Sequence, residues 1–373
     1  GLSVFEKHGP ARAKALADYV HYARSNDLYL TYVIINPQAE RAKDWGQQAD
    51  GLVARIVDED TRGITIRGAK MLGTAAVIAN EVLVANMQPL KKGEEQFAFS
   101  CAMPLNTKGI KMLSRKSYEA SAASVSESPL SSRFDENDAL LYFDDVLVPW
   151  ERVFCYRDIA LSNSLYTETA LRNYTAHQTS TRALVKLSLA AGLAVSVARS
   201  IKADQFLHVA QMLGECLNYV EEVKSGLVRS EVEAEPTGHG TLRPAIAPLQ
   251  ALRTRLPFTY PRIIEVLQTI GAGGFMLMPS GADMAAPELA RDAERYYQGA
   301  GMPALDRVRL FKLAWDLAGE GFGQRLLQYE RYYAGDPVRN LAMTYQGYDK
   351  RDLDRLVGAA LTLAGDPEPR NGG

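Results

Sequence analysis

The spacing of hydrophobic residues changes once along this chain. Residues 12–25 place Ala15, Leu16, Tyr19 and Val20 at three- and four-residue intervals, which predicts an amphipathic helix. From residue 28 to about residue 154, β-branched and aromatic runs separated by turn residues predict strands instead. These strands cover residues 28–35, 52–57, 64–68, 81–86, 96–103 and 140–143, and residues 58–63 have the composition of a hairpin turn.

From about residue 158 the hydrophobic residues follow a helical period. The predicted helices cover residues 180–200, 204–229, 249–255, 262–270, 305–318 and 323–333. Strands followed by helices predict an α+β fold, with a β domain at 28–155 against a helical bundle at 156–364. No GxGxxG motif follows a strand, which argues against a Rossmann fold. Residues 365–373 are rich in Pro and Gly and are expected to be disordered.

Composition excludes several classes of function. The 373 residues are 47% hydrophobic and carry a net charge of −2, so nothing recruits nucleic acid or an anionic membrane surface. The apolar run Leu187–Val197 is too short for a membrane span. The cysteines Cys101, Cys155 and Cys216 are scattered, form no CxxC pair and fit a reducing cytoplasm. The chain lacks a signal peptide and does not begin with Met, so we expect a processed or truncated form.

The glycine-rich stretch Gln268–Gly274 is the first candidate for cofactor binding. Three glycines in four residues, Gly271, Gly273 and Gly274, leave backbone N–H groups open to a phosphate or a flat ring. Gln268 adds an amide with both donors and an acceptor. The alternative is an ordinary glycine cap and turn at the end of a helix.

His177 is the candidate general base. It lies in a polar cluster that opens the predicted helix at 180–200, and the positive end of a helix dipole keeps an imidazole neutral and able to accept a proton. In the alternative reading, Thr179 or Ser180 caps the helix and His177 only contacts nearby backbone. The other histidines, His8, His21, His208 and His239, are expected to be structural or solvated.

Three further segments could contact a ligand. The turn Asn36–Arg41 follows a strand and presents Gln38 and Arg41, the latter suited to phosphate. Met71–Ala76 offers small residues and the Thr74 hydroxyl, and Tyr329–Asn340 contains a helix stop. Each can equally be a turn or a packing element. HExxH, GxSxG, P-loop and zinc-spacing motifs are all missing from the sequence.

These segments together resemble a known family. Residues 30–38, 68–75, 144–154, 177–182, 268–274 and 329–340 occur in the order seen in the 4-hydroxyphenylacetate 3-hydroxylase family, which includes chlorophenol and nitrophenol monooxygenases. The resemblance runs from about Tyr19 to Tyr348. It implies an acyl-CoA-dehydrogenase-like fold and a homotetramer. Residues 1–27 would be the remnant of an N-terminal helical domain that is otherwise largely absent.

The resemblance also implies the activity. Reduced FAD from a separate NAD(P)H:flavin oxidoreductase would react with dioxygen to form a flavin hydroperoxide, which hydroxylates a phenol, and the family's histidine base matches His177. In this fold the glycine patch would face a neighbouring subunit's flavin. The positions expected to bind FAD are Tyr32, Val33, Ile34, Gln38, Ala39, Glu40, Arg41, Thr74, Gln268, Gly271, Pro337, Val338, Arg339 and Asn340.

Two departures from the family leave alternatives open. An arginine and a tyrosine that hold the phenol in some members have no counterpart here, and Tyr32 stands where the hydroxyphenylacetate enzymes carry a histidine. A phenol other than hydroxyphenylacetate is therefore favoured. The alternatives are a 4-hydroxybutyryl-CoA-dehydratase-like lyase, which needs an iron–sulfur cluster, an acyl-CoA dehydrogenase, for which no catalytic glutamate can be placed, and a truncated non-catalytic member.

Overall fold

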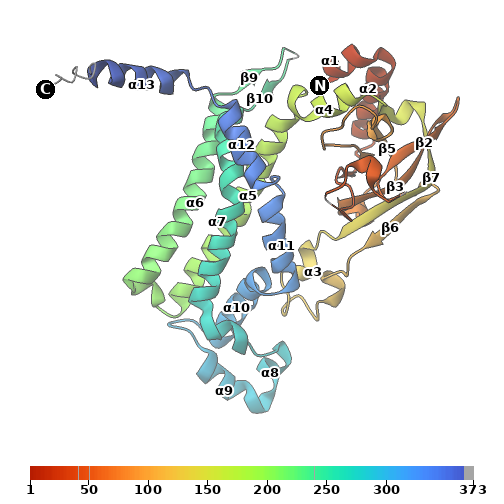
Figure 1. Ribbon diagram of the computed structural model, residues 1–373. Helices are drawn as coiled ribbons and strands as arrows, with labels where there is room; N and C mark the ends of the chain where they lie inside the picture. The colour runs from red at the N-terminus through yellow and green to blue at the C-terminus, as the bar shows by residue number, and fades with distance from the viewer. Residues whose placement is uncertain (41, 50, 239, 365–373) are drawn as a thin grey trace.

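The computed structural model describes residues 1–40, 42–49, 51–238 and 240–364. Two short helices, a β region and a long helical bundle follow one another along the chain (Figure 1). The helices of the first two parts are α1 (Leu2–His8), α2 (Pro10–Ser25) and α3 (Ser131–Phe134). The strands of the β region are β1 (Leu30–Val33), β2 (Arg55–Glu59), β3 (Gly63–Thr74), β4 (Glu81–Val84), β5 (Phe99–Pro104), β6 (Ile110–Ser114), β7 (Asp138–Pro149) and β8 (Val153–Tyr156).

The β region consists of two four-stranded sheets that share one core. Their strand orders are β1-β4-β5-β8 and β2-β3-β7-β6, and only β1 and β4 pair in parallel. Ala139, Leu141 and Phe143 of β7 point into this core at the two-residue period, which shifts by one residue at Asp145 so that Val146 and Val148 continue it. Gly68 is needed where β3 passes the preceding loop, because its φ is +111° and a Cβ would lie 2.3 Å from the Val53 carbonyl oxygen.

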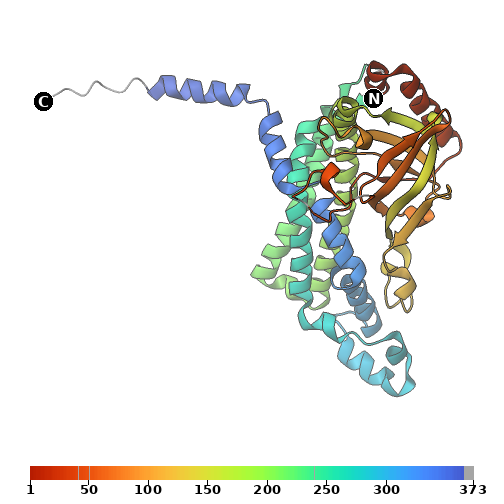
Figure 2. The same cartoon turned by 45° about the vertical axis from the view of Figure 1, so that its right-hand side comes forward.

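The bundle is built on three long helices. These are α5 (Leu171–Ser200), α6 (Leu207–Val232) and α7 (Ile246–Gly271), which pack on one another around a single apolar core. The remaining elements of this part are α4 (Ile159–Glu168), α8 (Gly281–Ala285), α9 (Pro287–Tyr297), α10 (Ala304–Ala318), α11 (Gly321–Tyr332), α12 (Pro337–Gly347), α13 (Arg351–Ala364) and the hairpin β9 (Glu235–Pro236) and β10 (Leu242–Arg243). In Figure 2, α13 projects away from the rest of the bundle.

Several predicted boundaries are wrong. The helix expected from residue 180 begins at Leu171, so His177 lies two turns inside it, and Thr179 and Ser180 do not cap it. The helices expected at 249–255 and 262–270 are one helix, α7, which contains Pro257 and Pro261. The predicted strands do not include β8, which follows β7 and ends at Tyr156. The tail 365–373, expected to be disordered, lies outside the described residues.

Helix α5 is both long and apolar. An 18-residue window of it has a mean hydropathy of 1.4, so by length and composition alone it could cross a membrane, contrary to the expectation from Leu187–Val197. In the fold, its buried face packs against α6, α7 and α10. A buried core helix passes the same test, so the finding is weak evidence for a membrane span.

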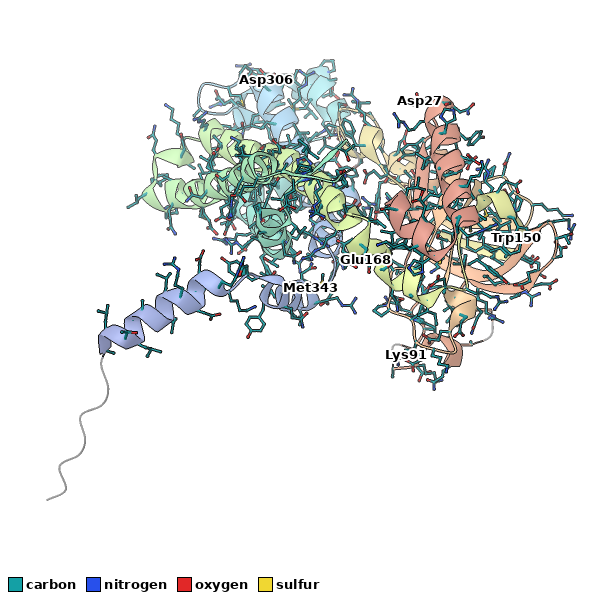
Figure 3. All side chains as sticks on the ribbon, turned by 90° about the horizontal axis from the view of Figure 1, so that it is seen from above. Asp27, Lys91, Trp150, Glu168, Asp306 and Met343 are labelled. Carbon is teal, nitrogen blue, oxygen red and sulfur yellow. The ribbon has the colours of Figure 1, made fainter. Side chains whose placement is uncertain are left out.

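Charged side chains join the β region to the bundle. Arg325 on α11 donates hydrogen bonds to Asp138 at the start of β7, with nitrogen–oxygen distances of 2.6 and 2.9 Å. Asp316 on α10 is fully buried and accepts from the backbone N–H groups of Leu130 and Ser131. Seen from above, Glu168 at the end of α4 lies where the chain passes from one part to the other (Figure 3). These contacts fix the surface on which β1 and β3 meet α5 and α11.

Candidate functional site

A cluster of aromatic and charged side chains lies where β1 meets α5 and α11. Tyr32 of β1 interacts with Tyr333, which follows α11, and the Tyr333 hydroxyl donates to Gln178 Oε1 at 3.2 Å. The Tyr329 and Tyr333 rings stack with centroids 4.6 Å apart. Arg182 of α5 covers both rings, its guanidinium carbon lying 4.4 Å from the Tyr333 centroid and 5.0 Å from that of Tyr329. We call these five residues the tyrosine cluster.

Glu330 anchors the charges of the tyrosine cluster. Its carboxylate is 3% exposed and accepts hydrogen bonds from both terminal nitrogens of Arg182, and from Lys186 Nζ at 3.1 Å. Burial lowers the pKa of Lys186, whereas the charge of Glu330 opposes that change. Arg182 Nε and the buried Tyr260 hydroxyl have no hydrogen-bond partner among the described residues. Arg182 of the cluster and the nearby Tyr260 therefore each keep one buried donor without a partner in the described part of the chain.

The tyrosine hydroxyls at this site indicate how the pKa of a bound phenol would change. Burial raises the pKa of Tyr32, of Tyr329 and of Tyr260. The charge of Arg182 acts in the opposite direction on all three hydroxyls but does not outweigh burial. A phenol bound here would likewise resist ionisation, so a proton acceptor would be needed to form its phenolate at neutral pH.

Thr74 joins this arrangement through Asp138. The Thr74 hydroxyl donates to Asp138 Oδ1 at 3.0 Å, and the Thr74 carbonyl accepts from Thr31 at 2.8 Å. Burial raises the pKa of Asp138, but hydrogen bonds and charge from Arg325 and Arg115 outweigh it and hold that pKa below its usual value. The Arg325 guanidinium carbon in turn lies 4.5 Å from the Tyr329 ring centroid. The structure thus brings Tyr32 and Thr74 to one surface.

The predicted FAD contacts that follow Tyr32 in the chain differ in how exposed their side chains are. The Val33 side chain is fully buried in the β core, so only its backbone is available, while Ile34 is half-buried. Gln38, Ala39 and Glu40 are exposed on the turn after β1. Arg41 lies outside the described residues.

Asn340 connects to the tyrosine cluster through Arg253. Asn340 is 3% exposed and donates to the Ala334 carbonyl at 2.9 Å, and Arg253 donates to the same carbonyl. Arg253 also donates to the Tyr166 hydroxyl at 2.6 Å, and Tyr166 lies close enough to Tyr32 to influence its pKa. Pro337, Val338 and Arg339 form the first turn of α12, where Asp336 caps the helix by accepting from the Arg339 N–H.

The glycine-rich stretch does not reach this surface. Gly271 ends α7, where a Cβ would lie 2.1 Å from the Phe275 ring, so this glycine is required for packing. Gln268 donates to the Ala318 carbonyl at 2.7 Å. Gln268 and Pro337 line one groove along α7 and α11, together with Phe258, Arg262, Leu327, Arg331 and other residues. These two predicted contacts therefore belong to a second surface.

His177 also points elsewhere. Its Nε2 lies 2.8 Å from Glu231 Oε1 on α6, whereas the adjacent Gln178 contacts Tyr333. Because His177 is inside α5, the helix-dipole argument for a neutral imidazole does not apply. The contact with Glu231 instead fixes the tautomer of a neutral imidazole: a hydrogen on Nε2 that donates to Glu231 leaves Nδ1 as the acceptor.

Sequence reasoning missed Arg182, Lys186 and Glu330 as site residues. Arg182 and Lys186 are four residues apart on a helix that is otherwise rich in alanine, so they share one face. Two cations on one face of a mostly apolar helix can be recognised from their spacing alone, and they could have indicated site residues here. Their partner Glu330 is 148 and 144 residues away and could not be assigned in this way.

Comparisons with known proteins decide the family. Models of the 4-hydroxyphenylacetate 3-hydroxylase N-terminal and C-terminal regions match residues 2–155 and 162–362. The chain belongs to the 4-hydroxyphenylacetate 3-hydroxylase family. It is 37% identical to the oxygenase component of 4-hydroxyphenylacetate 3-monooxygenase from Thermus thermophilus over 350 residues, 94% of this chain and 72% of that protein.

Solved structures agree with this membership. A crystal structure of the oxygenase component HpaB of 4-hydroxyphenylacetate 3-monooxygenase, complexed with FAD and 4-hydroxyphenylacetate, superposes with a TM-score of 0.91 at 36% identity. The match covers 97% of this chain and 76% of that one. An archaeal 4-hydroxybutyryl-CoA dehydratase from N. maritimus matches with a TM-score of 0.85 but at 19% identity, over 100% of this chain and 75% of that one, which shows the shared fold alone. The predicted α+β, acyl-CoA-dehydrogenase-like fold is confirmed.

Proposed function

We propose that this chain is the oxygenase component of a two-component, FAD-dependent monooxygenase that hydroxylates a phenolic ring. The observation that carries this proposal is the tyrosine cluster on a chain of the 4-hydroxyphenylacetate 3-hydroxylase family. Among the residues that the structure describes, no three His, Cys, Asp or Glu side chains could hold a metal. The family relationship, and not this absence, favours the oxygenase over the dehydratase.

The side chains of the tyrosine cluster fit a flavin ring. Tyr32 and Tyr333 offer aromatic surface and hydroxyls, and Arg182 Nε is a buried donor without a partner, which suits a flat ring that carries carbonyl oxygens. Thr74 adds a hydroxyl on the same surface. Reduced FAD, supplied by an NAD(P)H:flavin oxidoreductase, would provide two electrons to dioxygen, of which one oxygen atom enters the phenol and the other leaves as water.

The predicted proton acceptor stays His177, although its Nε2 contacts Glu231 on α6 and not the tyrosine cluster. Glu231 holds Nε2, so Nδ1 is free to take the proton of the phenol hydroxyl. The need for such a base follows from the raised pKa of the cluster's own tyrosines. The remaining predicted contacts, from Gln38 to Asn340, stay predictions, as does the division of the chain at residues 27 and 155.

We also propose a homotetramer in the cytoplasm. Exposed apolar side chains on α13, among them Leu353, Leu356, Val357 and Leu361, support burial against another subunit. The described cysteines Cys101, Cys155 and Cys216 are buried free thiols, which fits a reducing compartment.

One experiment tests the activity directly. The protein is supplied with enzymatically reduced FAD and air, and a panel of para-substituted phenols is assayed with identification of the products. We expect a catechol, or a quinol with loss of the substituent, from at least one phenol. Absence of any hydroxylated product across the panel, or a brown iron-containing protein, would contradict the proposal.

A further inference from the structure

Two arginines beside the tyrosine cluster have no carboxylate partner among the described residues. They are Arg172 in the first turn of α5 and Arg253 in α7. Other arginines of this region, such as Arg182, Arg325 and Arg115, each bind at least one carboxylate. Unlike these arginines, Arg172 and Arg253 carry positive charges that no described carboxylate neutralises.

Arg253 is held by neutral oxygens. It is 8% exposed, and its two terminal nitrogens donate to the Tyr166 hydroxyl at 2.6 Å and to the Ala334 carbonyl. A neutral hydroxyl and a carbonyl orient the guanidinium without cancelling its charge. A buried cation of this kind is costly unless an anion approaches it.

Arg172 approaches Arg253 from the neighbouring helix. One terminal nitrogen of Arg172 donates to Gln250 Oε1 at 2.9 Å, and Gln250 lies one turn before Arg253 on α7. Arg172 Nε is buried without a hydrogen-bond partner. Burial lowers the pKa of Arg172, and the charge of Arg253 contributes in the same direction. Two like charges thus face one region with a donor unused.

The loop beside Arg253 contains a glycine in a left-handed conformation. Gly335 has a φ of +98°, which favours glycine over other residues. A Cβ there would lie 3.7 Å from a terminal nitrogen of Arg253 and 3.5 Å from Asn340 Nδ2. The loop between α11 and α12 therefore brings bare backbone to this guanidinium.

We propose that Arg172 and Arg253 form a binding site for an oxyanion, either a phosphate group of FAD or the carboxylate of an acidic phenol. This inference rests on the proposed function for the choice of ligands. Guanidinium groups match phosphate and carboxylate geometry with paired donors, and an anion would offset the repulsion between the two cations.

Both proposed ligands, FAD and an acidic phenol, would contact residues that adjoin Arg253. The predicted FAD-contact segment Pro337–Asn340 adjoins Arg253 through the Ala334 carbonyl. Tyr166 adjoins Tyr32 of the tyrosine cluster and accepts from Arg253. A dinucleotide and an acidic phenol would therefore both place an oxyanion within reach of the same pair.

The test compares ligands with and without the oxyanion. Affinities of wild type and Arg172→Gln are measured anaerobically for reduced FAD against reduced riboflavin, and for 4-hydroxyphenylacetate against 4-ethylphenol. The matched control is Arg255→Gln, an arginine two residues after Arg253 on α7 that forms an exposed ion pair with Glu222 at 3.4 Å. Arg172→Lys keeps the charge but loses the paired geometry, and serves if the glutamine variant does not fold.

The expected result is a selective loss in Arg172→Gln. Losing a charge-assisted hydrogen bond should weaken one ligand roughly ten- to hundredfold. Loss for FAD but not riboflavin supports the site and identifies phosphate; loss for 4-hydroxyphenylacetate but not 4-ethylphenol supports it and identifies carboxylate. Equal losses for both members of each pair, or no loss beyond that of Arg255→Gln, would overturn the proposal.

Failure of the site and failure of the proposed function are distinguishable. Product formation by wild type with none of these selective losses removes the oxyanion site and leaves the monooxygenase intact. Selective loss in a protein that hydroxylates no phenol keeps the site and removes the proposed activity.

Discussion

Glu330 binds Arg182 through both carboxylate oxygens, so that α11 and α5 are joined by a buried ion pair. Lys186, one turn further along α5, donates to the same carboxylate. The ring of Tyr329, next to Glu330 in the chain, lies under both cations, with the Lys186 ammonium 5.4 Å from its centroid. This contact holds Tyr329 of the tyrosine cluster in place.

Glu330→Gln should therefore destabilise the fold. Removing one partner of a buried pair leaves uncompensated charge, here on Arg182 and Lys186, and costs about 3–5 kcal/mol of the free energy of unfolding. Urea denaturation followed by circular dichroism measures the loss. The control is Glu221→Gln, which removes an exposed pair with Lys224 and should cost under about 1 kcal/mol. Equal midpoints for the two variants would contradict the assigned role of Glu330.

Asp138→Asn should loosen the junction between the β region and α11. The carboxylate binds Arg325 and Arg115, and its pKa is held below the usual value, so its contribution to stability is present above the unfolded pKa and lost as pH falls through the folded pKa. We expect a loss of about 3 kcal/mol at pH 7.

The pH dependence provides the check. Between pH 5 and pH 3 the free energy of unfolding of wild type should fall more steeply than that of Asp138→Asn, as measured in urea. Asp18→Asn, at an exposed pair with Lys14, should follow the wild-type slope. Parallel slopes for wild type and Asp138→Asn would show that this carboxylate does not titrate with folding.

Lys70→Met should stabilise the protein at neutral pH. Lys70 is 1% exposed, its Nζ lies 3.4 Å from Asn86 Oδ1, and burial lowers its pKa to about 7. Between pH 7 and about 10 the unfolded chain keeps this proton while the folded chain loses it, so the free energy of unfolding of wild type rises with pH.

The advantage of Lys70→Met over wild type should therefore shrink as pH rises. Between pH 7 and pH 9.5 we expect it to fall by on the order of 3 kcal/mol in urea denaturation. Lys92→Met replaces an exposed lysine and should show no such trend. A difference between wild type and Lys70→Met that stays constant with pH would show an ordinary pKa for Lys70.

His177→Ala should leave FAD binding intact and lower the rate of phenol hydroxylation at pH 7. The expected reduction in kcat/KM is roughly 10²–10⁴-fold, the range for loss of a general base. Glu231→Gln should produce a smaller reduction, because the amide still accepts from Nε2 but no longer stabilises the protonated imidazole. Unchanged turnover in His177→Ala, with His208→Ala as the exposed control, would remove His177 from the mechanism.

Most of the architecture follows from hydrophobic spacing, and the errors have local causes. The start of α5 was misplaced because Thr175, Thr179 and Thr181 make the segment read as a polar turn. In the structure their hydroxyls bond to carbonyls four residues earlier, on Leu171, Thr175 and His177, which satisfies these side chains inside a helix. Burial of Thr179 and Ser180 then outweighs their weak helix propensity, and the buried Ala176 is itself a strong helix former.

The functional site was harder to predict from the sequence than the fold. Motif order predicted Tyr32, Thr74 and Asn340 as cofactor contacts, and these stay predictions, although Thr74 and Asn340 form buried or half-buried hydrogen bonds to Asp138 and Ala334. The charges that organise them come from residues far apart in the chain, such as Arg182 and Glu330. Periodicity states which face of a helix is buried, but it does not state which helix covers that face.

The two prolines of α7 divide this helix into two segments that can bend relative to each other. Pro257 and Pro261 lack amide hydrogens, so the carbonyls of Arg253 and Pro257 lose their usual donors within the helix. Arg253 lies at the joint itself, and Gln268 lies on the far segment. Pro257 and Pro261 also line the groove that contains Gln268, so bending at this joint would change the shape of the groove together with the position of the Arg253 guanidinium.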